Sequence, residues 1–548
     1  MIGLVTTTAA GRTCAQVLSS VLPGTRGYDV RDVDAAFSEC EQLVCFLATG
    51  AVVRLLAPLL QDKAADPGVV CVDEARRFAV ALLGGHGGGA NDLARTVADA
   101  LGAQAVITTA TDATGLPGLD TLGWPVEGAV AAVSRAMLDG EPVRLEADAT
   151  WPLPPLPVGA AGEHVLAVTD RLLPLDALTA VLRPPSLVVG VGASRGVGAD
   201  EVEALLERAL ADAGLSVGSV RALASVAEKA DEPGLLELST RRGWPLLLHT
   251  APELAQVDVP NPSAAPLAAV GTPSVAEAAA SLYGTLLVPK TKSTMATVAV
   301  ARRPPRGRLA LVGLGPGARD LLSPRATAEL RQASVWVGLD QYVDQVRDLA
   351  RPGTRLLVTG LGQEEQRAHS AVREAQQGHA VALLGSGDSG VYAMASPALE
   401  VAGDDIDVVG VPGITAALAA SNLLGAPLGH DHAAISLSDL HTPWPAIEAR
   451  IRAVAEADLV VTFYNPRSRG RDWQLAKAVG MLLEHRPADT PVGIVTDASR
   501  PGQQVALTTL GRLDVEQVTM LACVVVGSSQ SRAVAGRFVT PRGYAWRT

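Results

Sequence analysis

A short glycine-rich segment, Gly-Leu-Gly-Pro-Gly at residues 313–317, constrains the fold of this chain more than any other stretch. An apolar run, Leu309 to Val312, precedes it, and Ser323-Pro324 follows it. The apolar run predicts a buried strand. The Ser-Pro pair predicts a helix start, because a hydroxyl caps free N–H groups and proline has no N–H to lose. The glycines therefore form a strand-to-helix turn that a bound cofactor can approach closely.

The same segment leaves two cofactor classes open. Extended through Ala318, it also satisfies the pattern G-x-G-x-x-G/A of dinucleotide-binding folds. Asp340 follows by roughly 20 residues, where such folds place the acid that binds the ribose. An NAD-binding fold is thus an alternative that the other strand ends of the C-terminal half must decide.

Length and composition bound the architecture. A chain of 548 residues exceeds a single core and predicts several domains. Its residues are 48% hydrophobic but only 3% aromatic, which favours helices packed on parallel sheets. A net charge of −12 argues against a nucleic-acid partner, which needs a basic face. Because we find neither a secretory signal nor a bilayer-length apolar run, we expect a cytoplasmic protein with no membrane partner.

The cysteines predict no metal site. There are 5, their spacing matches no zinc or iron–sulfur ligand pattern, and no C-x-x-C occurs. We therefore expect reduced, mostly buried thiols.

Two proline-rich breaks divide the chain, at residues 151–157 and 302–307. The first cannot be helix or central strand and predicts a stiff connector. We expect domains at 1–150, 158–300 and 307–548. Apolar runs alternate with helical segments in all three, which predicts successive open-sheet α/β domains. The polar and glycine-rich turns at their strand ends are expected to form ligand faces.

Four further strands of the third block end in turns rich in Gly, Asp, Asn or Arg. These turns are residues 385–392, 410–417, 464–469 and 496–503. Any one of them could be an ordinary surface turn. With the turn at 313–317 they follow a fixed order, which is far harder to obtain by chance.

That order resembles the tetrapyrrole (precorrin) methyltransferase family, which uses S-adenosylmethionine. The turn at 313–317, Gly387-Asp388 through Tyr392, and Pro412 to Ala416 match the family's motifs. The resemblance covers residues 308–545 and displaces the NAD alternative, which explains only the first turn. It implies a two-lobed fold for this block and a homodimer.

The resemblance also implies the site. Residues matching the cofactor pocket are Pro316, Ser386, Gly387, Asp388, Val391, Thr415, Ala416 and Asn465. Gly315 and its neighbours would face the tetrapyrrole. Catalysis would rest mainly on alignment of the methyl group with a ring carbon, so no nucleophilic side chain is required.

Within that family, residues 436–444 and 462–468 are similar to the branch that methylates carbon 17 of precorrin-3B and contracts the ring, forming a lactone. The substrate carries many carboxylates, and guanidinium groups bind these in pairs. Candidate clamps are Arg467, Arg469, Arg471 and Arg500. Asp439 and His441 are candidate catalytic acid–base groups. Solvated arginines and structural polar residues are the alternatives.

Residues 1–300 are similar to cobalt-precorrin-5A hydrolases in four segments, 83–91, 108–112, 190–196 and 272–277. That reaction opens the lactone and releases acetaldehyde. It needs a base and oxyanion donors. His86, in a glycine loop, is the catalytic base candidate, and Asn91 and Asp112 are substrate-binding candidates.

Other residues of this half carry weaker signals. Ala193-Ser194 stands where the family leads us to expect Cys-Arg, which leaves the role of that turn open. Glu228 and Lys229 are weaker candidates on what we expect to be a solvated helix face.

The sequence thus predicts a bifunctional enzyme acting on a tetrapyrrole partner with S-adenosylmethionine as cofactor. The alternative is a methyltransferase whose N-terminal half binds a tetrapyrrole without catalysis. The residues do not decide between the cobalt-containing and the metal-free, oxygen-dependent route.

Overall fold

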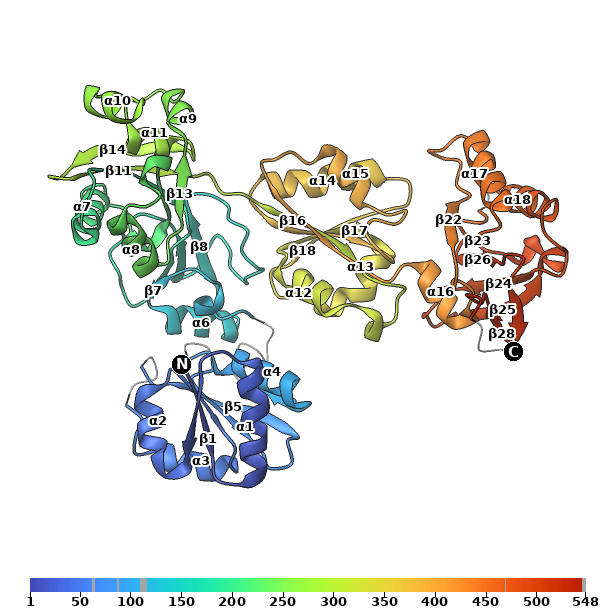
Figure 1. Cartoon of the computed structure of the whole chain (residues 1–548), viewed down its shortest axis with the longest axis horizontal. Helices are drawn as coiled ribbons and strands as arrows, with labels where there is room; N and C mark the ends of the chain where they lie inside the picture. Colours follow the sequence, from blue (N-terminus) through green and yellow to red (C-terminus); the bar gives the residue numbers. More distant parts are fainter. Residues whose placement is uncertain (62–64, 86–87, 109–115, 469, 545–548) are drawn as a thin grey trace. The chain divides into compact units, whose positions relative to one another are not determined.

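The computed structural model of this chain describes residues 1–61, 65–85, 88–108, 116–468 and 470–544. It divides into two compact units, coloured along the sequence in Figure 1. Unit 1 holds Met1–Ala149 with Leu156–Pro305, and unit 2 holds Thr150–Pro155 with Arg306–Thr548. No helix among the described residues is both long and apolar enough to cross a bilayer.

The first sheet of unit 1 has six strands in the order β2-β1-β3-β4-β5-β6. The strands are β1 (Ile2–Thr6), β2 (Thr25–Asp29), β3 (Gln42–Cys45), β4 (Gly68–Val72), β5 (Phe78–Leu83) and β6 (Gln104–Val106). Its helices are α1 (Ala9–Val21), α2 (Val33–Glu39), α3 (Thr49–Leu56) and α4 (Ala90–Leu101). β1 to β4 are parallel and bury side chains on both faces.

The direction of β5 overturns one expectation. β5 runs antiparallel to β4, and β6 runs parallel to β5. The described residues of the turn after β5, 84–85 and 88–91, therefore lie at the amino-terminal edge of β3 and β4, where the Gln42 side chain donates to the Gly88 carbonyl at 3.0 Å. Thr7 and Thr8 after β1, and Thr49 after β3, lie at the opposite, carboxyl-terminal edge. The polar turns of this sheet do not form one ligand face.

A four-stranded sheet, β7-β10-β9-β8, follows. Its elements are β7 (Val126–Gly128), α6 (Val130–Asp139), β8 (Val143–Ala147), β9 (His164–Val168) and β10 (Thr179–Leu182). β8 and β9 flank the proline-rich segment 151–157 and pair in parallel. The predicted boundary between residues 150 and 158 thus falls inside one sheet.

The last sheet of unit 1 has the order β13-β12-β11-β15-β14. Its strands are β11 (Leu187–Ala193), β12 (Val220–Val226), β13 (Leu246–His249), β14 (Thr285–Lys292) and β15 (Ala296–Arg302). Its helices are α7 (Ala199–Asp212), α8 (Pro233–Arg242), α9 (Ala251–Ala255), α10 (Ala264–Val270) and α11 (Val275–Ser281). α11 lies directly on β11. Gly190 permits this close approach, since a Cβ atom there would clash with the Ala276 carbonyl.

Unit 2 begins with an all-parallel lobe of order β18-β17-β19-β16-β20. The strands are β16 (Arg308–Gly313), β17 (Val335–Leu339), β18 (Arg355–Thr359), β19 (Ala380–Gly385) and β20 (Asp407–Val411). α12 (Pro324–Gln332) and α13 (Asp340–Val346) cover one face, and α14 (Glu364–Gln376) and α15 (Ala395–Val401) cover the other (Figure 1). α12 begins at the predicted Ser-Pro pair, and the Ser323 hydroxyl accepts from the Ala326 N–H at 3.1 Å.

The second lobe of unit 2 is a mixed sheet, β22-β23-β26-β24-β25. Its strands are β22 (His432–Ser436), β23 (Val460–Tyr464), β24 (Pro491–Thr496), β25 (Gln504–Thr509) and β26 (Ala522–Val526). Its helices are α16 (Ala416–Leu424), α17 (Trp444–Glu456) and α18 (Gln474–Leu483). A small sheet joins β21 (Gly425–Ala426), β27 (Arg532–Val534) and β28 (Arg537–Val539). The predicted α/β class and two-lobed C-terminal part are confirmed.

Candidate active site

Three glycine turns follow β16, β19 and β20, which are neighbours in the parallel sheet. The amides of Gly315 and Gly387 donate to each other's carbonyls at 3.0 and 2.8 Å, and both residues have positive φ, +73° and +69°. A Cβ atom on Gly413 would clash with the Gly387 carbonyl, and one on Gly313 would lie 2.7 Å from the Gly413 nitrogen. The turns pack backbone against backbone, which only glycine permits.

Asp388 fixes two of these turns. Its Oδ1 accepts from the Gly390 N–H at 2.9 Å, and its Oδ2 accepts from the Gly413 N–H at 3.0 Å. One carboxylate therefore shapes the second turn and ties it to the third. Of the neighbouring predicted cofactor residues, Ser386 and Val391 are partly exposed and Pro316 is buried.

Two tyrosines join the lobes beside these turns. Tyr392, at φ +51°, donates from its hydroxyl to the Ala434 carbonyl of β22 at 2.9 Å. Its ring centroid lies 5.0 Å from that of Tyr464, the last residue of β23. The Tyr464 hydroxyl lies 2.6 Å from Thr415 Oγ1 and accepts from the Ala417 N–H at 2.9 Å. Burial raises the pKa of Tyr464, so it stays a neutral phenol.

Tyr464 was missed as a site residue by sequence reasoning, although it stands directly before the predicted Asn465. Its position at the end of an apolar strand was the available signal. Thr415 and Ala416 are both predicted to line the cofactor pocket. Thr415 is the N-cap residue of α16 and contacts Tyr464, Ala416 is the first residue of that helix, and both are partly exposed.

The turn after β23 is held by a polar network. Asn465, at φ +49°, donates from Nδ2 to Ser436 Oγ at 3.1 Å. The buried Arg471 donates to the Asn465 carbonyl at 3.0 Å and to Ser438 Oγ at 3.1 Å. Asn465 therefore lies at the strand ends of β22 and β23, and the predicted clamp Arg471 is engaged with the protein.

The predicted acid–base residues lie on the loop between β22 and α17. Asp439 and His441 are both exposed. Asp439 Oδ2 accepts from the side chain of the buried Gln474 at 3.0 Å. The loop is thus anchored at Asp439 on α18.

The predicted arginine clamps separate into two kinds. Arg467 pairs with Glu516 at 2.6 Å and donates to the Val515 carbonyl at 2.9 Å, within the second lobe. Arg500 donates from Nε to the Pro316 carbonyl at 2.8 Å and from Nη2 to Ser386 Oγ at 3.0 Å. Arg469 lies outside the described residues.

The predicted hydrolase residues are only partly visible. His86 and Asp112 lie outside the described residues. Asn91 is buried in the first turn of α4, and its backbone N–H donates to the Gly85 carbonyl at 2.9 Å.

Glu228 is exposed, as expected, but Lys229 is not on a solvated face. Its side chain is 14% exposed and pairs at 2.9 Å with the buried Glu232, which also accepts from the Gly196 N–H at 2.7 Å. The reason is that the turn after β12 folds back against the turn after β11.

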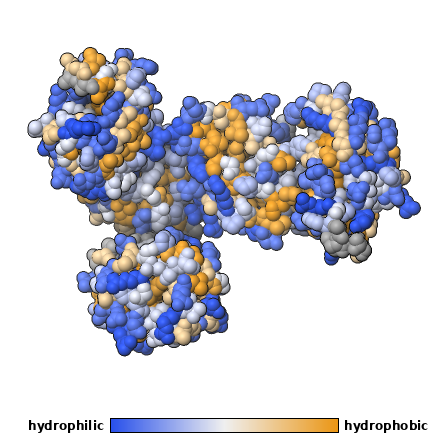
Figure 2. All heavy atoms as spheres, viewed as in Figure 1, coloured by the Kyte–Doolittle hydropathy of each residue, from blue (hydrophilic) through white to orange (hydrophobic). Residues whose placement is uncertain are grey.

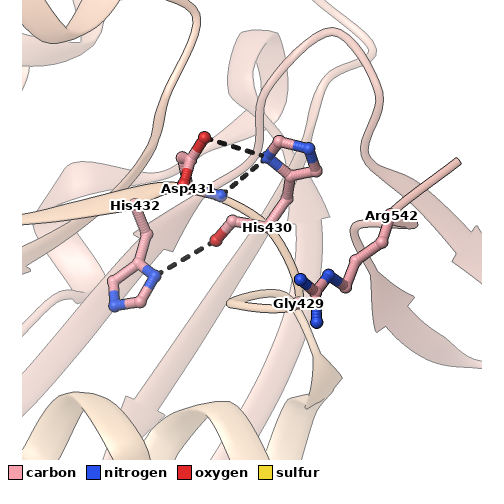
Figure 3. Close-up of a pocket in the computed structure, with 5 residues that line it drawn as sticks. All are labelled: Gly429, His430, Asp431, His432 and Arg542. Carbon is pink, nitrogen blue, oxygen red and sulfur yellow. Dashed lines mark hydrogen bonds and ion pairs between the residues drawn. The ribbon is translucent and has the colours of Figure 1, made fainter.

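A further pocket, of about 480 Å³, is lined by Gly429, His430, Asp431, His432 and Arg542 (Figure 3). His430 Nδ1 accepts from the Asp431 N–H at 2.8 Å. In Figure 3 His432 and Arg542 lie on opposite sides of His430. His432 begins β22, whereas the glycine turns and Asn465 adjoin the other end of that strand, so this pocket is separate from the site above.

Unit 2 is a two-lobed α/β fold whose glycine turns are hydrogen-bonded to one another at one edge of a parallel sheet, the edge where such sheets bind ligands. Comparisons with known proteins give the family. The model of the Tetrapyrrole (Corrin/Porphyrin) Methylases matches residues 308–514. Models of the Cobalamin synthesis G N-terminal part and C-terminus match residues 32–112 and 187–301.

The curated relatives agree. The chain is 45% identical over 240 residues to the probable cobalt-factor III C(17)-methyltransferase of Salmonella typhimurium, covering 43% of this chain and 99% of that one. It is 36% identical to the precorrin-3B C(17)-methyltransferase of a Sinorhizobium species, covering 44% and 98%. It spans 45% to 54% of the length of several other relatives.

A crystal structure of the methyltransferase CobJ is similar at 36% identity, covering 43% of this chain and 100% of that one, with a TM-score of 0.42. The chain belongs to the tetrapyrrole methylase family. It joins this methylase to both parts of the cobalamin synthesis G protein, which confirms the fusion predicted from the motifs.

Proposed function

We propose that residues 307–548 transfer a methyl group from S-adenosylmethionine to carbon 17 of precorrin-3B or cobalt-factor III, with contraction of the ring. The carrying observation is the assembly of all three family motifs at one sheet edge, where Asp388 ties the second turn to the third. The names of relatives that align over almost their full length support the position of methylation.

The residues present fit S-adenosylmethionine. The glycines let the three turns pack closely against one another. Beside them the site offers the Asp388 carboxylate and the rings of Tyr392 and Tyr464 rather than a phosphate cradle. These groups suit a sulfonium cation. Ser386, Val391, Thr415 and Ala416 would hold the cofactor, which supplies an electrophilic methyl group when bound.

The chain's own contribution is orientation. The hydrogen-bonded glycine turns fix one side of the site, and Tyr464 and Asn465 fix the other. None of these residues is a nucleophile, so alignment of the methyl group with the ring carbon carries most of the rate enhancement. We assign proton transfer during ring contraction to Asp439 and His441. Both are exposed on one loop, where a bound macrocycle would shield them from water.

The test is to incubate the full chain with S-adenosylmethionine and, in parallel, cobalt-factor III or precorrin-3B, and to measure product masses. Gain of one methyl group on either substrate is expected and would also name the route. Methylation of neither, with cofactor bound, would assign the protein another position on the ring.

We further propose that residues 1–300 open the lactone of cobalt-precorrin-5A and release acetaldehyde. Both matched parts of the cobalamin synthesis G protein support this. His86 is proposed as the base, with Asn91 and Asp112 binding substrate. Acetaldehyde release should be lost in His86→Ala. If the unaltered chain releases none, the half is a tetrapyrrole-binding module instead.

We propose a homodimer through unit 2. Hydrophobic residues lie on its outer surface among hydrophilic ones (Figure 2). The exposed hydrophobic residues of the second lobe include Leu418 and Leu423 of α16, 48% and 36% exposed, and Val505 and Leu507 of the adjoining edge strand β25, 44% and 40% exposed. Such an edge is commonly covered by another chain. Light scattering should give twice 56.3 kDa, and Leu507→Arg should give the monomer.

A further inference from the structure

We propose that Arg500 is a positioning residue. From the second lobe its side chain bonds to both the first and the second cofactor turn and holds them together, and we call these two bonds the latch. The proposal rests on the methyl transfer proposed above. It differs from the sequence-based expectation that Arg500 is a free clamp for substrate carboxylates. A latch assembles the cofactor pocket, whereas a clamp acts on the tetrapyrrole alone.

The loop that carries Arg500 is shaped to present it. The loop follows β24, and Asp497 and Ser499 adopt φ of +48° and +61°, unusual for residues with a Cβ atom. The Arg500 N–H donates to the Asp497 carbonyl at 2.9 Å, and the Ser499 N–H donates to the Gln503 side chain at 2.8 Å. Uncommon backbone conformations of this kind persist where the surrounding structure enforces them, often at functional sites.

The guanidinium reaches two different turns of the first lobe. Nε donates to the Pro316 carbonyl at 2.8 Å, and Nη2 donates to Ser386 Oγ at 3.0 Å. Its stem passes over Gly317, where a Cβ atom would lie 2.7 Å from Arg500 Cγ. Gly317 therefore leaves the space that the arginine fills. Pro316 and Ser386 are both predicted cofactor residues, so one side chain sets their separation.

The electrostatics favour a positioning role. Among the residues that the structure describes, no carboxylate forms an ion pair with Arg500, and its two bonds go to a carbonyl and a hydroxyl. Arg467, in contrast, already pairs with Glu516. A charged donor with neutral acceptors makes stronger bonds than a neutral donor would. Because the turns are bonded to one another, loosening one of them disturbs the rest.

The test uses the full chain with Arg500→Ala and Arg500→Lys. Two quantities are measured: the Kd of S-adenosylhomocysteine by calorimetry, and kcat and KM for the tetrapyrrole that the unaltered chain methylates. Arg306→Ala is the matched control. Arg306 also makes two side-chain bonds, an ion pair with Asp407 at 3.0 Å and a hydrogen bond to the Ile406 carbonyl at 3.1 Å, but at the amino-terminal edge of the first-lobe sheet, away from the glycine turns.

For Arg500→Ala we expect a Kd for S-adenosylhomocysteine about tenfold higher or more, because two bonds to a charged donor are lost. We expect a lower kcat and a nearly unchanged KM for the tetrapyrrole. Arg500→Lys should recover only part of the affinity, because an ammonium lacks the planar fork that reaches both acceptors. Arg306→Ala should leave the Kd as it is.

The opposite pattern overturns the latch. A higher tetrapyrrole KM with an unchanged Kd would make Arg500 a substrate clamp. A change in thermal stability alone, with Kd and kcat intact, would make it structural. If the unaltered chain binds S-adenosylhomocysteine but methylates neither tetrapyrrole, the position of methylation fails while the Kd still decides the latch. If it binds none, both proposals fall.

A double-mutant cycle gives a second readout that survives partial loss of stability. Ser386→Ala removes one acceptor of the latch. If Arg500 acts through Ser386, the effects of Ser386→Ala and Arg500→Ala on the Kd will be less than additive. Fully additive effects would show that the two residues act independently and would overturn the latch.

Discussion

The hydroxyl of Tyr464 lies 2.6 Å from Oγ1 of Thr415, and this contact ties a strand end of the second lobe to the helix that follows the third glycine turn. The same hydroxyl accepts from the Ala417 N–H at 2.9 Å. A single phenol thereby serves one of the free N–H groups at the start of α16 and orients a predicted cofactor residue.

Tyr464→Phe should weaken both the fold and the cofactor site. The substitution keeps the ring but leaves Thr415 and the Ala417 N–H without this partner. We expect a loss of about 1–3 kcal/mol in the free energy of unfolding, measured in urea, and a higher Kd for S-adenosylhomocysteine. Tyr544→Phe, at a residue 63% exposed, is the control and should change neither. An unaltered Kd in Tyr464→Phe would remove this tyrosine from the site.

Gly413→Ala should abolish methyl transfer, because the added Cβ atom would clash with the Gly387 carbonyl and force the turns apart. Gly410→Ala is a matched control three residues earlier, where a Cβ atom would meet nothing within 4 Å. We expect the control to keep its activity and its S-adenosylhomocysteine affinity. Equal activity of both variants would mean that the close contact of the turns is dispensable.

The buried thiols should be unreactive in the folded chain. Burial raises the pKa of Cys45 to about 12, with a smaller effect from the neighbouring Cys71, and burial raises the pKa of Cys523 to about 12. Because the thiolate is the reactive form, iodoacetamide at about pH 8 should label neither residue until urea unfolds the chain. Mass mapping of the labelled peptides is the check, and rapid labelling of native Cys45 would contradict it.

The turns could be predicted from sequence because their signals are local. An apolar strand, glycines and a capped proline define a strand-to-helix turn within about a dozen residues. How the turns bind one another is not local. The bridge between Gly315 and Gly387 and the reach of Arg500 to Pro316 depend on residues far apart in the chain.

Strand direction and pairing were likewise beyond local pattern. The apolar run of β5 looks the same in either direction, yet its antiparallel pairing with β4 moves the residues that follow it, Gly84 and Gly85, to the other edge of the sheet. The prolines at 151–157 exclude helix and central strand correctly, but they do not reveal that β8 and β9 on either side are partners. Local chemistry predicts elements, and long-range packing decides their neighbours.

Lys229 was expected on a solvated helix face, but it pairs with the buried Glu232, a contact that a local sequence pattern does not reveal. This pair gives a prediction about pH. Burial raises the pKa of Glu232, but hydrogen bonds from Lys229 and the Gly196 N–H, with the charge of Lys229, outweigh it and lower the pKa below the ordinary 4.5. A carboxyl with a depressed folded pKa stabilises the fold above its unfolded pKa. That stability is lost as the pH falls below about 4.5 through the folded pKa.

The urea midpoint of the chain should therefore fall in acid. The hydrogen-exchange protection of β11 and β12, corrected for intrinsic exchange rates, should fall with it. Glu232→Gln should flatten this dependence, because glutamine does not titrate. Lys229→Met should cost about 3 kcal/mol or more at neutral pH, since it leaves a buried carboxylate without its cation. The neighbouring pair Arg195 and Asp231, 79% and 74% exposed, is the control, and Asp231→Asn should change little. An acid transition that persists unchanged in Glu232→Gln would assign it to another carboxyl group.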